Sequence, residues 1–334
     1  MASIDKLPSG KYRIRVYDKY TKKQKTFTAS TKSEAKRLAS QWEFMHDNSK
    51  DMTVEECVKL YIENRSNTLS PSTIRSYLLT LENRMEDIRY RSAKNLTSEE
   101  VQRFVNDLSA KYSPKTVKNT YSLISAILRT FYPDKAIHVR MPQSKPVERH
   151  IPTEDDVKKL VQMAGPDLRK CILLASAGTL RRGEIAALTY GDIDNNTIHV
   201  HADIVYDENG GWIYKDVPKT SESDRYVEYP PEIIKELGTG EPDERIVKFK
   251  TPDTITAMFI RLRNKLGLQC RFHDLRAYSA SIMHAIGVPD AVIMKRGGWK
   301  TATVMQQCYR HALDDKMKAE IDKTNEYMKN LVVQ

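Results

Sequence analysis

The last third of this 334-residue chain gathers side chains that suit chemistry on a phosphate ester. Three clusters follow one another: His273-Asp274-Leu275-Arg276, Arg296-Gly297-Gly298-Trp299 and Tyr309-Arg310-His311. A guanidinium group presents a planar set of donors to phosphate oxygens, histidine moves a proton near neutral pH, and a tyrosine hydroxyl can act as a covalent nucleophile. The stretch contains no carboxylate cluster and no plausible metal cage. It therefore predicts phosphoryl chemistry carried out by side chains alone.

Charge indicates what such a site would act on. The chain has 40% hydrophobic and 29% charged residues and a net charge of +10, and its length allows two or three domains. Residues 1–50 carry twelve Lys or Arg against five Asp or Glu, residues 51–150 carry sixteen against twelve, and residues 151–334 carry 26 against 27. Cations that pair with phosphates release condensed counterions, so the N-terminal excess indicates a nucleic-acid binder. A solvated lysine-rich surface is the alternative.

The cysteines and the apolar runs bear on location. Cys57, Cys171, Cys270 and Cys308 lie far apart, without a CxxC pair or the Cys/His spacing of a zinc site, and are expected to be reduced. No signal peptide is recognisable, and the longest apolar run, residues 171–180, is too short to span a bilayer. We expect a cytoplasmic protein that does not enter a membrane.

Residues 1–50 predict a small sheet with one helix. Residues 11–17 alternate apolar and basic side chains as a half-buried strand does, residues 23–29 look like its partner, and residues 33–47 have helical periodicity. A basic strand face of this kind could lay a β-ribbon in a DNA groove, whereas a protein-binding module with a soluble edge is the alternative. The DNA-contact candidates on this face are Arg13, Arg15, Lys23 and Lys25.

Residues 51–135 predict a compact all-helical bundle. Four segments each open with a capping residue, and these residues are Thr53, Ser70, Thr97 and Ser113. Backbone N–H groups at helix starts favour phosphate, so basic residues near them are the candidates for DNA contact. They are Arg75, Lys115 and Lys118.

The remainder predicts a linker and a mainly helical α+β domain. Residues 136–152 are rich in proline and lack periodicity, as an extended interdomain linker does. In residues 153–334 a helix begins after Thr153, residues 168–180 form a buried helix ending near Gly178, and another helix starts at residues 181–184. Strands are expected at 197–205, 212–217 and 225–229, forming one small antiparallel sheet, with helices from residue 251 onward.

Five motifs occur in order along this last domain, and together they resemble the tyrosine recombinase (phage integrase) family. They are Gly178–Leu188, Pro218-Lys219-Thr220, His273–Arg276, Gly298-Trp299 and Tyr309-Arg310-His311. The family pattern is Arg, Lys, His-x-x-Arg, His or Trp, and Tyr. The resemblance covers the whole chain and implies an arm-site DNA-binding domain at 1–50, a core-site-binding bundle at 51–135 and a catalytic domain with a C-terminal tail helix at 153–334.

The resemblance implies how the scissile phosphate would be held. Arg181 and Arg276 would clamp its non-bridging oxygens, His273 would assist proton movement, and Trp299 would donate its ring N–H. Arg182 is an equally charged rival to its neighbour, and the register of the motif favours Arg181.

The resemblance also implies the groups that make and break bonds. Tyr309 would be the nucleophile, giving a 3′-phosphotyrosyl bond and a free 5′ hydroxyl, and Lys219 would protonate the leaving oxygen, with Lys215 as a competitor. Glu184 would orient the cations, and His311 fits the Tyr-x-His pattern without an assigned step. No metal, ATP or other cofactor would be needed.

Partners follow from the same resemblance. The apolar spacing after Tyr309 suggests a tail helix that packs on a neighbouring protomer, so a homotetramer on double-stranded DNA with core and arm sites is implied; packing within its own domain is the alternative. A directionality factor or a host DNA-bending protein would assist an integrase of a bacterial phage or conjugative transposon, acting at the nucleoid. A type IB topoisomerase and a non-catalytic DNA-binding regulator are the competing functions.

Overall fold

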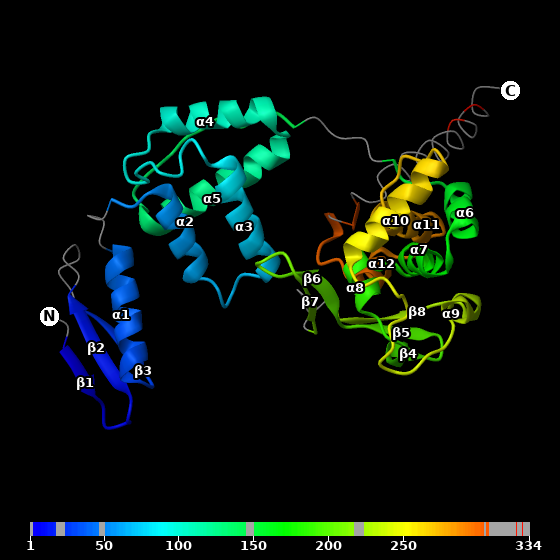
Figure 1. The fold of residues 1–334 in the computed structure, drawn as a ribbon, viewed down its shortest axis with the longest axis horizontal. Helices are drawn as coiled ribbons and strands as arrows, with labels where there is room; N and C mark the ends of the chain where they lie inside the picture. The colour runs from blue at the N-terminus through cyan, green and yellow to red at the C-terminus, as the bar shows by residue number, and fades with distance from the viewer. Residues whose placement is uncertain are drawn as a thin grey trace. The chain divides into compact units, whose positions relative to one another are not determined.

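The computed structural model describes residues 3–17, 24–46, 51–144, 150–216, 224–303, 305–306, 325 and 329. The chain divides into two compact units, residues 1–146 and residues 147–334 (Figure 1). The division falls inside the segment predicted as a linker.

The N-terminal sheet has three antiparallel strands and one covering helix. Its elements are β1 (Ser3–Lys6), β2 (Tyr12–Tyr17), β3 (Gln24–Ala29) and α1 (Lys32–His46), with strand order β1-β2-β3. Ile14 and Val16 on β2 are buried in one core with Ala35 and Ala39 of α1. The two predicted strands and the helix are confirmed. Strand β1 was not predicted, because four residues with two charges show no periodicity.

The register of the sheet corrects one expectation about its basic face. Arg13 and Arg15 share a face, but Lys25 pairs with Val16 and so points to the opposite side, the side that α1 covers. Residues that are paired across two strands lie on the same face of a sheet. The basic residue type alone does not show on which face a residue lies. Lys23 lies outside the described residues.

The second part of this unit is a bundle of helices. They are α2 (Val54–Glu63), α3 (Pro71–Arg84), α4 (Ser98–Lys111) and α5 (Pro114–Phe131). Each begins directly after its predicted capping residue, whose hydroxyl accepts a backbone N–H three residues on. The faces that carry Val58, Phe104 and Ile124 form one buried core.

Residues 136–144 are extended and are anchored to the bundle. The His138 N–H donates to Ser98 Oγ at 3.1 Å, and the Arg140 N–H donates to Gln102 Oε1 at 2.7 Å. Ile137 packs against the bundle core. This half of the predicted linker therefore lacks regular structure but is held against α4.

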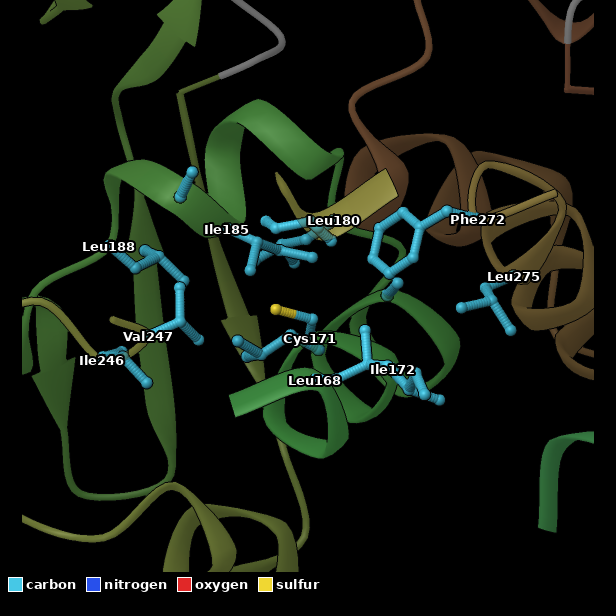
Figure 2. Packing of buried hydrophobic residues seen from close by; sticks show 14 of the residues in the cluster. Leu168, Cys171, Ile172, Leu180, Ile185, Leu188, Ile246, Val247, Phe272 and Leu275 are labelled. Atoms are coloured by element: carbon cyan, nitrogen blue, oxygen red, sulfur yellow. The ribbon is translucent and has the colours of Figure 1, made fainter. Parts of the chain in front are cut away.

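The second unit is built around one buried helix. Its helices are α6 (Glu154–Met163), α7 (Pro166–Gly178), α8 (Arg182–Ala187), α9 (Pro231–Leu237), α10 (Pro252–Lys265), α11 (Asp274–Ala285) and α12 (Asp290–Gly297), with a 3₁₀ turn η1 at Tyr190–Asp192. Leu168, Cys171 and Ile172 of α7 meet residues of α8, α11 and the 246–247 segment in one core (Figure 2). Each fully buried aliphatic side chain contributes roughly 1.5–3 kcal/mol.

Two small sheets replace the single sheet that was expected. The strands are β4 (Ile193–Asp194), β5 (Thr197–Val200), β6 (Asp203–Tyr206), β7 (Trp212–Lys215) and β8 (Arg225–Glu228); β4-β5-β8 form one sheet and β6-β7 another. The predicted strand 197–205 is thus split after Val200. Buried side chains recur at every second residue across the break, at 198, 200, 202 and 204. The sequence pattern is therefore that of one continuous strand, although the chain passes from one sheet to the other.

Candidate active site

The turn between α7 and α8 fixes the position of Arg181. At Gly178 a Cβ atom would lie 1.6 Å from the hydroxyl oxygen of Tyr229, so a larger residue does not fit. Thr179 follows in the left-handed region with φ of 61°, which is strained for a β-branched residue. Its hydroxyl donates to the Arg296 carbonyl oxygen at 3.2 Å and helps to hold the turn. Arg181 is then the N-cap residue of α8.

Glu184 is the counter-charge for two arginines. Its carboxylate accepts from Arg181 Nη1 at 2.5 Å and from the Arg181 backbone N–H at 2.7 Å. The Arg225 Nη1 and Nη2 groups donate to the two oxygens at 3.2 and 2.9 Å. Glu184 is 4% exposed, and burial alone would raise its pKa. The charges of Arg225, Arg181 and Arg276 outweigh burial and hold the pKa of Glu184 at about 2, so it is ionised at neutral pH.

The start of α11 presents Arg276 and His273. Arg276 is 2% exposed, donates from Nη2 to the Gly297 carbonyl oxygen at 2.9 Å, and lies 4.8 Å from the centre of the Trp299 ring. His273 directly precedes the helix and keeps solvent-exposed surface. Partial desolvation of its ring and the charge of Arg276 lower the pKa of His273 to about 4. The imidazole is therefore neutral at pH 7.

Three consecutive carbonyl groups at the end of α12, residues 296–298, form a strip that holds three arginines. Arg225 Nε donates to the first at 2.9 Å. Arg276 Nη2 donates to the second at 2.9 Å, and Arg181 Nη2 donates to the third at 3.1 Å. Carbonyl groups at a helix C-terminus lack intrahelical partners and carry the negative end of the helix dipole. This carbonyl strip therefore brings arginines from α8, β8 and α11 to one place.

Two glycines make the strip possible. A Cβ atom on Gly297 would lie 1.9 Å from the Trp299 ring, and Gly298 has a left-handed backbone with φ of 63°. Trp299 is 7% exposed and packs in a small core with Ile293 and Met305. The indole is thus packed beneath Arg276 by residues of α12 and by the chain that follows it.

The neighbouring arginine has different partners. Arg182 Nη1 donates to Asp253 Oδ1 at 2.9 Å and to Thr256 Oγ1 at 2.7 Å, both on α10. Arg181 instead contacts Glu184 and the carbonyl strip. Arg181 and Arg182 therefore differ in their contacts, and Arg181 is the one whose carbonyl partner is next to that of Arg276.

Two residues near the site were not predicted. Arg225 is 5% exposed and lies on the buried face of β8, two residues before buried Val227. This alternating pattern of the strand could have indicated from the sequence that Arg225 points inward. Asp203 on β6 packs its carboxylate on Gly183, where a Cβ atom would lie 1.8 Å from Asp203 Oδ1. Burial and the charge of Glu184 raise the pKa of Asp203 to about 6. Nothing in its sequence neighbourhood marked it.

Three of the predicted site residues, Lys219, Tyr309 and His311, lie outside the described residues. Their positions stay predictions. The rival Lys215 is described: it ends β7 and is paired in register with Asp203.

The predicted DNA-contact residues are spread over the first unit. Arg13 and Arg15 lie on the outer face of the N-terminal sheet, with Nη atoms 3.5 and 3.6 Å from Asp5 Oδ2. In the bundle, Arg75 is half-buried on α3, whereas Lys115 and Lys118 are exposed in the first two turns of α5. These positions are compatible with contact to a phosphate backbone, and the contacts themselves remain predictions.

Within the described ranges, no group of three or more His, Cys, Asp or Glu side chains is placed to hold a metal ion. Cys57, Cys171 and Cys270 are buried free thiols. None of the helices in the described part of the chain is both long and apolar enough to cross a membrane.

Sequence comparison finds distant relatives. No protein-family model matches the chain. It is 24% identical over 281 residues to a tyrosine recombinase XerC-like protein of Caldanaerobacter subterraneus subsp. tengcongensis, covering 69% of this chain and 71% of that protein. A shorter match, 37% identical over 59 residues, is to an integrase of Saccharopolyspora erythraea and covers 18% of this chain and 13% of that protein.

Structure comparison shows the fold over most of the chain. The Tn1549 transposon integrase in complex with transposon right end DNA is 17% identical with a TM-score of 0.67, covering 81% of this chain and 99% of that one. A lambda integrase dimer bound to a COC′ core site is 18% identical with a TM-score of 0.59, covering 92% and 94%. A lambda integrase tetramer bound to a Holliday junction matches with the same TM-score over 91% and 94%.

The three-stranded sheet with its helix, the helical middle and the α+β second unit reproduce the lambda-integrase fold. The recombinase relative covers more than two thirds of the chain. The chain is therefore similar in sequence to a tyrosine recombinase XerC-like protein and has the fold of the Tn1549 and lambda integrases.

Proposed function

We propose that this protein is a site-specific recombinase that integrates and excises a bacterial mobile element through a 3′-phosphotyrosyl intermediate. The observation that carries the proposal is the carbonyl strip of residues 296–298, which fixes Arg181 and Arg276 on neighbouring carbonyl groups. The Tn1549 and lambda integrases, which share the fold, support the assignment to a mobile element.

The two arginines are suited to a phosphodiester. Arg181 is partly exposed and uses one N–H each for Glu184 and the carbonyl strip, so the rest of its five-donor fork can face phosphate oxygens. Arg276 supplies a nearly buried positive charge, which solvent screens little. Because both guanidinium groups are fixed before the substrate arrives, they stabilise charge that develops on a pentacoordinate phosphorus without reorganising.

The bond changes balance without an outside reactant. The Tyr309 oxygen attacks the phosphorus, a bond forms between them, and the bond from phosphorus to the 5′ oxygen breaks. The phenolic proton passes to a neutral base, for which His273 is suited, and Lys219 protonates the departing 5′ oxygen. A 5′ hydroxyl from the partner strand then reverses these steps and frees Tyr309. Since the phosphotyrosyl ester conserves the bond energy, rejoining needs no energy source.

The lowered pKa of His273 fits this role. A base must be deprotonated before it can accept a proton, and the imidazole is neutral at pH 7 in the free protein. Binding of a phosphate brings negative charge next to the ring and stabilises its protonated form. The affinity of His273 for a proton therefore increases when the substrate is in place.

We further propose that the enzyme acts as a homotetramer on paired core sites, with residues 1–50 binding arm sites. The lambda integrase tetramer on a Holliday junction supports this assembly. The second unit also exposes apolar side chains at the end of α11 and on α12, where Ile282, Ile286 and Val292 are 40%, 73% and 52% exposed. The C-terminal segment of a neighbouring copy is the occupant that we propose for this surface.

A nicked suicide substrate tests the proposal. The joined ends of the element that carries the gene supply the core site. A nick a few nucleotides beyond the scissile phosphate lets the short fragment with the free 5′ hydroxyl diffuse away, which traps the covalent adduct. We expect wild-type protein to give an adduct on denaturing gels. Tyr309→Phe should bind the same DNA in a mobility-shift assay and give none. Absence of an adduct with wild-type protein on its cognate site would refute the catalytic assignment.

A further inference from the structure

Asp203 brings a second carboxylate to the arginine site. It is the first residue of β6, the strand that packs on α8. A Cβ atom on Gly183 would lie 1.8 Å from Asp203 Oδ1 and 2.8 Å from the backbone oxygen of Ile204. Gly183 directly precedes Glu184 in the first turn of α8. Because position 183 has no side chain, the Asp203 carboxylate lies directly on the backbone beside Glu184.

The two carboxylates differ in their partners. Glu184 binds Arg181 at 2.5 Å and Arg225 at 2.9 Å. In the part of the chain that the structure describes, Asp203 forms no ion pair and no hydrogen bond, although Lys215 is its register partner on β7. A partly buried carboxylate without donors is less stable in its ionised form than one in water. Asp203 is therefore the carboxylate of this site that can accept a proton without breaking an existing contact.

We propose that Asp203 is a charge-compensating residue of the active site, which takes up a proton from the solvent when a phosphodiester binds at Arg181. This inference rests on the proposed binding of the scissile phosphate by Arg181 and Arg276. The site holds three guanidinium groups, which belong to these two residues and to Arg225, together with two carboxylates. While both carboxylates are ionised, the negative charge of a phosphodiester cancels the one positive charge in excess. Protonation of Asp203 restores a positive charge opposite the phosphate.

The surroundings of Asp203 favour this exchange near neutral pH. Burial and the charge of Glu184 raise the pKa of Asp203 to about 6, whereas the charges of Arg181, Lys215 and Arg182 act in the opposite direction. The carboxylate is thus mostly ionised at pH 7 in the free protein. A phosphate next to Arg181 adds negative charge, which favours the protonated form. Glu184 cannot exchange a proton in this range, because its pKa is about 2.

Two other titratable groups lie in the neighbourhood. At the far end of β6, Tyr206 donates a hydrogen bond to Asp253 of α10. His273, whose pKa is lowered to about 4, also gains affinity for a proton when a phosphate binds. A test of the proposal therefore has to separate the proton taken up by Asp203 from one taken up by His273.

Removal of the Asp203 charge should stabilise the free protein. The pKa of this carboxyl is raised in the folded state, so its contribution to stability is full below about pH 3.8 and is lost as the pH rises through about 6. Asparagine has the shape of the protonated carboxyl group and does not titrate. We expect Asp203→Asn to lower the equilibrium constant of unfolding at pH 8 by up to roughly a hundredfold, measured by urea titration. A variant less stable than wild type at pH 8 would overturn the proposal, because Asp203 would then have a stabilising partner.

Proton uptake on DNA binding tests the proposal directly. Tyr309→Phe protein, which binds without cleaving, would be titrated with the core-site duplex in two buffers that differ in their heat of ionisation, so that calorimetry counts the protons taken up. A second duplex with a neutral methylphosphonate at the scissile position lacks the phosphate charge. We expect the uptake at pH 6.5 to be larger with the phosphate duplex by roughly half a proton per protomer. Addition of Asp203→Asn should abolish this difference.

The outcomes are distinguishable. If the difference between the duplexes persists in Asp203→Asn, another group takes up the proton and the proposal is overturned. Equal uptake with both duplexes in the protein that retains Asp203 would overturn it as well. Asp194→Asn is the matched control, because Asp194 is an exposed carboxylate on β4, and it should keep the full difference. Failure of the proposed function would be seen separately, as the absence of a covalent adduct when protein with Tyr309 intact meets the nicked substrate.

Discussion

Arg181 and Arg182 are adjacent and identical in charge, yet they belong to different parts of the second unit. Arg181 joins Glu184 to the carbonyl strip through two different nitrogens, whereas Arg182 binds Asp253 on α10. Bridging two fixed acceptors requires a planar fork, and a lysine ammonium cannot reproduce it. The geometry thus assigns a separate task to each arginine.

A pair of lysine substitutions tests this difference. We expect Arg181→Lys to lower the cleavage rate roughly 10²- to 10³-fold, the range seen when one donor to a transition-state charge is removed. Arg182→Lys should change it by less than about threefold, since its exposed ion pair contributes little. Single-turnover cleavage of the nicked substrate measures both. Equal defects in the two variants would contradict the assignment.

Glu184 ties the site to the stability of the second unit. In Glu184→Gln the buried guanidinium group of Arg225 loses its counter-charge, so we expect the free energy of unfolding to fall by roughly 3–5 kcal/mol. The pKa of Glu184 is lowered to about 2, so its contribution is full above the unfolded value of 4.5 and is lost as the pH falls towards 2. Urea titration at several pH values, followed by Trp212 and Trp299 fluorescence, measures this. A pH-independent difference below about 1 kcal/mol would show that the pair is not stabilising.

At the scale of elements, the end of α12 organises the site. Its three last carbonyl groups hold arginines from three other elements, and their accessibility depends on the two glycines. The positions of these arginines therefore depend on a short backbone segment as much as on their own elements.

Gly297→Ala should damage catalysis through this segment. The new methyl group would overlap the Trp299 ring at 1.9 Å, which should cost roughly 1–3 kcal/mol of stability and displace the indole beneath Arg276. We expect cleavage to slow at least about tenfold, since small displacements of positioning groups have large effects. Gly165→Ala, at the start of α7 with open space around it, is the control. Comparable rates for the two variants would contradict a special role for Gly297.

Helix starts were predictable from the sequence because capping is local. Thr53, Ser70, Thr97 and Ser113 each bind a backbone N–H only three residues away, so a short window contains the whole interaction. The split of segment 197–205 was not predictable in this way. Its buried side chains keep a period of two through the break, and the sheet to which each half belongs is decided by distant partners.

The difference between local patterns and contacts with distant residues also explains which residues near the site were predicted and which were not. Arg181, His273 and Arg276 were predicted as site residues from the order of their motifs along the chain. Arg225 binds Glu184, 41 residues earlier, and the carbonyl strip, 71 residues later. No local pattern encodes such pairings, and its inward strand position was the one available signal. Asp203 lacked even that signal.

At the scale of the whole molecule, positive charge is concentrated in the first 50 residues, while residues 151–334 are nearly neutral. Binding that rests on neutralised phosphates weakens as the salt concentration rises, because each released counterion gains less entropy when it enters a more concentrated salt solution. This distribution favours the N-terminal sheet as a source of salt-dependent DNA affinity.

The outer face of that sheet can be tested by charge removal. Arg13→Gln/Arg15→Gln in the full chain should flatten the slope of log affinity against log salt by roughly 0.9 for each DNA phosphate that the arginines no longer neutralise. Lys36→Gln on α1, which covers the opposite face, should leave the slope as in wild type. Fluorescence anisotropy with duplex DNA across a salt series measures the slopes. If the Lys36 variant flattened the slope more than the arginine pair, the DNA-binding face would be the wrong one.

The central claim is that Tyr309 carries the DNA strand, and the most direct measurement is to locate the covalent bond. Wild-type protein would be trapped on the nicked core site, digested with nuclease and protease, and its peptides sequenced by mass spectrometry. We predict one nucleotide-bearing peptide, with the nucleotide attached through its 3′ phosphate to Tyr309. Attachment to another residue, or through a 5′ phosphate, would contradict the assignment.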